Sequence, residues 1–159
     1  MSLYPANELR TYFIDTLEIC RLPSDNPQPE GPNAVCYVEP IGGAPYGPDS
    51  PVDSAARAGT TISITEQGGL SSIAGTGKYM ETAFFRVDIR SDNALAAADV
   101  CRAITNALED QQHMQIGELT AEYSGIYSRA QSLPIDQETS AGHWKTLTLA
   151  LVIHREQLT

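Results

Sequence analysis

The residues from Glu81 to Asp110 constrain the fold most, because a strand pattern there passes directly into a helix pattern. Apolar and charged residues alternate from Phe85 to Arg90, which predicts a half-buried strand with a charged outer face. Ser91 and Asp92 offer side-chain oxygens that can accept hydrogen bonds from unpaired N–H groups, so we expect the helix to start there. The helix carries one apolar stripe, formed by Ala97, Val100, Cys101, Ile104 and Leu108. A strand that runs straight into such a helix can pack that helix on its own sheet.

Five other segments carry helix or strand patterns. They are a helix over Asn7 to Cys20, stopped by Pro23, and strands over Ala34 to Glu39, Thr60 to Thr65, Leu119 to Tyr127 (with a possible start at Ile116) and Trp144 to His154. Strands follow one another in runs instead of alternating with helices. This order predicts an α+β fold with a mostly antiparallel sheet, two helices packed on one face and long Gly/Pro-rich loops. A length of 159 residues is most simply one domain, spanning residues 1–159.

Long connections separate these segments. Prolines fill the connection from Leu22 to Asn33, and Gly and Pro fill the one from Pro40 to Gly59. Gln67 to Lys78 and Gln131 to Gly142 are also expected to be loops. Connections of this length are uncommon in compact domains, and those that occur tend to be functional or disordered. We therefore expect these loops either to become ordered on a neighbouring subunit or to be simply mobile.

Charge and composition exclude some classes of function. Lys and Arg number 10 against 20 Asp and Glu, a net charge of −10, and tight binding to DNA draws its affinity from cations. The acidic surface would either repel passing DNA or merely keep the protein soluble. No apolar tract is long enough to cross a bilayer, and the N-terminus does not read as a secretory signal. The odd number of cysteines, with Cys20 and Cys101 on apolar stripes, indicates free thiols and a reducing compartment.

Motifs for catalysis or cofactor binding are missing from the sequence. Gly75 to Lys78 resembles a phosphate-binding loop, but Ser72 replaces the first required glycine and Tyr79 follows the lysine. His113 is expected to end the long helix and His154 to lie on the polar face of the last strand, with no metal-ligand spacing. No serine lies in a nucleophile elbow. We therefore expect no catalytic, cofactor-binding or metal-binding residues and a protein that is not an enzyme.

The layout of the whole chain resembles the tail terminator proteins of long-tailed bacteriophages, also called tail completion or minor capsid proteins. The similar features are the opening helix, the proline-rich first connection and a strand pair broken by a long loop. The strand from Lys78 to Arg90 leads into an alanine-rich helix after the polar turn at Ser91, and Ser132 to Asp136 precedes a final alternating strand.

The resemblance implies a structural protein of the virion tail or neck, assembled in the cytoplasm of the host bacterium. It implies a ring of identical subunits, hexameric, that caps the tail tube, stops tail polymerisation and joins the tail to the head connector protein. DNA would pass through the lumen without specific binding, and no membrane would be involved. Candidate contacts to the tube protein or to a neighbouring subunit are Tyr46, Val52, Lys78, Arg86 and Arg90. The alternatives are a head completion or neck ring protein, and a small ligand-binding or enzymatic α+β domain with a loop lid.

Overall fold

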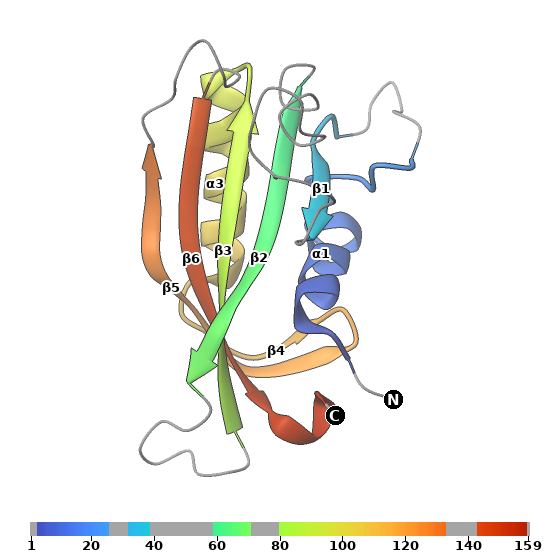
Figure 1. Cartoon of the computed structure of the whole chain (residues 1–159), viewed down its shortest axis with the longest axis vertical. Coiled ribbons are helices and arrows are strands. Elements are labelled where there is room, and N and C mark those ends of the chain that lie inside the picture. Colours follow the sequence, from blue (N-terminus) through green and yellow to red (C-terminus); the bar gives the residue numbers. More distant parts are fainter. Residues whose placement is uncertain (1–2, 26–31, 39–58, 71–79, 133–142, 159) are drawn as a thin grey trace.

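The structure is a computed structural model and describes residues 3–25, 32–38, 59–70, 80–132 and 143–158 (Figure 1). The elements in chain order are α1 (Pro5–Asp15), β1 (Val35–Val38), β2 (Thr60–Leu70), β3 (Met80–Ser91), α3 (Ala94–Leu108), β4 (Gln111–Ile116), β5 (Leu119–Ser132), β6 (His143–His154) and the short 3₁₀ helix η2 (Arg155–Gln157). Neither α-helix within these residues is long and apolar enough to span a bilayer.

The strands form one six-stranded sheet in the order β1-β2-β3-β6-β5-β4. Only the β1–β2 pair is parallel, and the other four pairs are antiparallel. Figure 1 shows β3 and β6 running side by side through the middle of the molecule. The prediction of an α+β fold with a mostly antiparallel sheet is confirmed.

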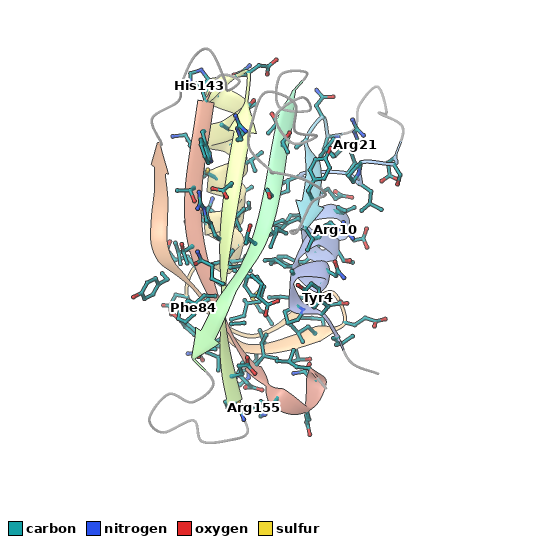
Figure 2. All side chains as sticks on the ribbon, viewed as in Figure 1. Tyr4, Arg10, Arg21, Phe84, His143 and Arg155 are labelled. Atoms are coloured by element: carbon teal, nitrogen blue, oxygen red, sulfur yellow. The ribbon has the colours of Figure 1, made fainter. Side chains whose placement is uncertain are left out.

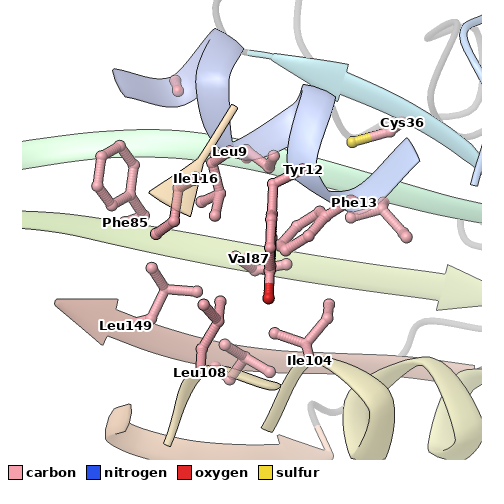
Figure 3. Packing of buried hydrophobic residues seen from close by; sticks show 14 of the residues in the cluster. Leu9, Tyr12, Phe13, Cys36, Phe85, Val87, Ile104, Leu108, Ile116 and Leu149 are labelled. Carbon is pink, nitrogen blue, oxygen red and sulfur yellow. The ribbon is translucent and has the colours of Figure 1, made fainter. Parts of the chain in front are cut away.

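The two helices cover the apolar face of the sheet. Phe85, Val87 and Ile89 of β3 are fully buried on this face, as their alternation predicted. Side chains of both helices join the same cluster, among them Phe13 of α1 and Ile104 of α3 (Figure 3). Burying each such side chain contributes about 1.5–3 kcal/mol, so this shared cluster holds the helices to the sheet.

The helix α3 starts later than predicted. Asn93 is the N-cap, and its Oδ1 accepts hydrogen bonds from the backbone N–H of Leu95 at 2.9 Å and of Ala96 at 3.3 Å. Ser91 belongs to the end of β3, where its hydroxyl lies 2.8 Å from the hydroxyl of Thr60. The predicted stripe is otherwise confirmed, because Ala97, Cys101, Ile104 and Leu108 are buried and Val100 packs, partly buried, against the core.

The helix α1 ends at Asp15, not at Cys20 as predicted. Glu18 adopts a φ of 53°, and the N–H of Ile19 turns back to donate to the carbonyl of Phe13 at 3.1 Å. A left-handed residue of this kind closes a helix, although it is more often a glycine or an asparagine. Cys20 is buried as predicted, but it lies after the helix and not on its stripe.

The strand predicted from Leu119 to Tyr127 lies within β5, but its possible start at Ile116 is wrong. Gly117 and Glu118 form a turn that joins β5 to β4, a strand that was not predicted. His113 therefore lies on β4 and does not end a helix, so that prediction is wrong. Asp110, with a φ of 53°, turns the chain abruptly from α3 into β4. Helix periodicity alone does not reveal such a turn.

Two strands are also longer than predicted. β2 continues to Leu70 and β5 to Ser132, so the expected loops from Gln67 and Gln131 begin with strand residues. The remainder of both loops, and residues 40–58 of the loop from Pro40 to Gly59, lie outside the described residues.

Candidate functional site

The predicted interface residues fall into two groups. Tyr46, Val52 and Lys78 lie outside the described residues. Arg86 and Arg90 lie on β3 with their side chains on the sheet face turned away from the helices, which we call the outer face.

Arg86 is held by a carboxylate of its own strand. Its Nε lies 3.0 Å from Oδ1 of Asp88, and the indole Nε1 of Trp144 donates to the same oxygen at 3.2 Å. The Asp88 side chain is 1% exposed, whereas the Arg86 side chain is 38% exposed. Asp88 thus orients Arg86 while leaving part of its guanidinium open to solvent.

Arg90 is buried. The alternation from Phe85 to Arg90 predicts instead that the charged side chains of this strand lie on an exposed outer face. Arg90 is 1% exposed, and its guanidinium carbon lies 5.1 Å from the ring centroid of Trp144. Thr61 and Ser63 of β2 are buried beside it on the same face. Arg90 is therefore not accessible to a neighbouring subunit in this structure, whereas part of the Arg86 side chain is. That these two arginines form an interface stays a prediction.

An aromatic patch, defined here as Phe84, Tyr123 and Tyr127, lies on the outer face next to Arg86. The rings of Phe84 and Tyr127 meet edge to face with their centroids 5.3 Å apart. Tyr127 is 76% exposed and Tyr123 is 37% exposed. Figure 2 shows Phe84 in the lower half of the sheet, away from α1. Sequence reasoning missed this patch because it joins residues of β3 and β5, whose proximity depends on the order of strands in the sheet.

Two histidines contact one carboxylate at the border of the patch. Nδ1 of His113 lies 2.8 Å from one oxygen of Glu122, and Nε2 of His154 lies 3.2 Å from the other. A register shift in β5 between Ala121 and Tyr123 places Glu122 between them. Within the described residues, no three His, Cys, Asp or Glu side chains are grouped as a metal ion would require. Protonated histidines here would form ion pairs with Glu122.

The three cysteines are free and buried. Burial raises the pKa of Cys101 to about 11. Burial and a hydrogen bond with the thiol of Cys20 raise the pKa of Cys36 well above its ordinary value. The thiols of Cys36 and Cys101 are therefore poor nucleophiles at neutral pH.

No protein-family model matches this chain, and no curated protein matches it either.

Proposed function

We propose that this chain is a structural virion protein that closes into a hexameric ring on the end of a phage tail tube. The ring stops the polymerisation of the tube and joins the tail to the head connector. The proposal rests on the resemblance of the chain to tail terminators, and the α+β fold is compatible with it.

The observation that carries a role in assembly is the aromatic patch beside Arg86. Exposed apolar patches on soluble proteins mark interaction sites, and aromatic and arginine side chains contribute most to the affinity of interfaces. A contact between this patch and a different surface of the next subunit would be head-to-tail, and such contacts close into rings when the rotation allows. The net charge of −10 would let DNA pass without binding.

The first test is the native mass in solution, measured across a concentration series with and without purified tail tubes. We expect a closed ring, alone or on the tubes, and tubes that no longer elongate once the protein is added. A ring that binds the portal or head connector but leaves tube elongation unchanged would favour the head completion or neck alternative. A monomer under all these conditions contradicts the proposal and favours the ligand-binding alternative.

Three variants test the interface. Tyr127→Ser and Arg86→Glu are expected to weaken ring formation, because a central aromatic contact contributes about 2 kcal/mol, or roughly thirtyfold in affinity. Tyr4→Ser is the matched control, since Tyr4 is 47% exposed but lies beside α1 (Figure 2). Equal weakening by Tyr4→Ser and Tyr127→Ser would remove the aromatic patch from the interface. Arg90→Glu is unsuitable, because placing a carboxylate at this buried position is expected to unfold the chain.

A further inference from the structure

A cavity of about 520 Å³ lies between α1 and the turn that joins β4 to β5. Its lining includes Tyr12 and Asp15 from α1 and Gln115, Gly117 and Glu118 from the hairpin. It lies on the helix side of the molecule and shares none of its lining residues with the aromatic patch on the outer face.

The hairpin wall of the cavity is fixed by hydrogen bonds. The carboxylate of Glu8 accepts from the backbone N–H of Glu118 at 2.6 Å and rests against Gly117. The side-chain amide of Gln115 donates to the carbonyl of Gly117 at 3.0 Å and accepts from the hydroxyl of Thr120 at 3.0 Å. These groups already have partners, so the wall exists before any ligand arrives.

Three other polar groups that line the cavity have no partner among the described residues. The carboxylates of Asp15 and Glu118 form no ion pair or hydrogen bond there, and no basic side chain lines the cavity. The hydroxyl of Tyr12 forms no hydrogen bond within the same part of the chain, although Tyr12 is only 7% exposed. Figure 3 shows its side chain extending away from the α1 ribbon, with the oxygen at the far end.

The hydroxyl oxygen of Tyr12 is not one of the buried side-chain atoms without a partner in the described part of the chain, so it reaches solvent and is open to a ligand in the cavity. Burial raises the pKa of Tyr12, so its hydroxyl is neutral and can both donate and accept. A ligand that supplies a donor to this oxygen and positive charge to the two exposed carboxylates would replace water at all three groups at once.

We infer that this cavity binds an arginine side chain presented by a partner protein. A guanidinium is planar, carries five N–H donors and pairs with two carboxylates at the same time, whereas a lysine ammonium acts as a point charge. The ring of Tyr12 adds a surface on which a cation can rest. The inference concerns the cavity alone and does not depend on the proposed role in the tail.

The test is a titration of the full chain with the capped tripeptide acetyl-Gly-Arg-Gly-amide, followed by amide chemical shifts in ¹H–¹⁵N NMR spectra. We expect saturable shifts confined to residues 11–16 and 115–118. The same peptide with citrulline keeps the shape of arginine without its charge, and we expect it not to bind. The lysine peptide should bind several-fold more weakly.

Matched variants separate the cavity from general attraction to an acidic protein. Asp15→Asn combined with Glu118→Gln should weaken binding about tenfold, the effect of losing two exposed ion pairs. Tyr12→Phe removes only the hydroxyl and should weaken binding severalfold. The control is Asp92→Asn with Asp99→Asn, which changes the net charge equally at exposed positions of the α3 region and should leave the affinity unchanged. Absence of saturation, equal binding of the citrulline peptide, or equal weakening by the control pair would overturn the inference.

Discussion

Replacing Gly117 by alanine tests how the hairpin is tied to α1. Gly117 has a φ of +61°, which L side chains rarely adopt, and an alanine there costs about 1–2 kcal/mol in backbone strain. A Cβ at this position would also meet the carboxylate of Glu8 and lie 3.1 Å from the Glu8 carbonyl. The carboxylate would have to leave the N–H of Glu118, which forfeits a further hydrogen bond of about 1 kcal/mol. We expect Gly117→Ala to lower the free energy of unfolding by about 2–3 kcal/mol.

A double-mutant cycle by urea denaturation, monitored by circular dichroism, measures the coupling between Glu8 and Gly117. Glu8→Ala alone should cost about 1 kcal/mol, because the same hydrogen bond is lost. In the Glu8→Ala background, Gly117→Ala should cost only the backbone strain and the remaining contact with the Glu8 carbonyl, so the two changes should be less than additive by about 1 kcal/mol. Strict additivity, or a Glu8→Ala variant as stable as the wild type, would refute this account of the turn.

Three further predictions concern the outer face, the thiols and pH. Asp88→Asn keeps an acceptor oxygen but loses the charge that holds two donors, so we expect the free energy of unfolding in urea to fall by about 1–2 kcal/mol. The control Asp99→Asn changes an exposed carboxylate and should stay within about 0.5 kcal/mol of wild type. The thiol of Cys101 has a pKa of about 11, so at pH 8 it should react with Ellman's reagent about a hundredfold more slowly than a thiol whose pKa has the ordinary value. Fast labelling without denaturant would contradict the burial of this thiol. Burial and the charge of Glu81 raise the pKa of Glu66, so its contribution to stability is full below the ordinary pKa of a glutamate and is lost as pH rises through the raised value. Because Glu66 is exposed and solvent screens most of this effect, Glu66→Gln should stabilise the protein at pH 7 by no more than about 0.5 kcal/mol and leave it unchanged at about pH 4. Destabilisation at pH 7 would show the sign to be wrong.

The parts of the fold that local periodicity determines could be predicted from the sequence. The strand through Val87 and the helix through Ile104 each have one uninterrupted apolar face, and both faces are buried as expected. Helix and strand ends were less predictable, because they depend on single residues in unusual conformations. Glu18 and Asp110 both have a φ of 53°, and neither is the glycine that would mark such a turn in a sequence.

Burial on the outer face could not be predicted from alternation. The pattern from Phe85 to Arg90 separates apolar from charged residues, and charged residues are seldom fully buried unless they are paired. Asp88 and Arg90 are nevertheless each 1% exposed, and the indole of Trp144 contacts both. Trp144 lies on β6, more than fifty residues away along the chain, so the partner that makes this burial tolerable is visible only once the sheet order is known.

The cavity depends on the β4–β5 hairpin, whose first strand and turn could not be predicted from the sequence. Its two walls are α1 and the β4–β5 turn, and a single strand extending from Ile116 to Tyr127 would have no turn at Gly117 and no wall facing Tyr12. The apolar residues on either side of the turn, Ile116 and Leu119, are both fully buried, so the hairpin tip packs into the core that α1 also joins. That packing, together with the bond from Glu8, brings the carboxylates of Asp15 and Glu118 to one cavity although about a hundred residues separate them. Any change that loosens the hairpin tip should therefore weaken the binding of an arginine peptide along with the fold, whereas Tyr12→Phe should weaken the binding alone. Separating these two effects distinguishes a binding site from a gap in packing.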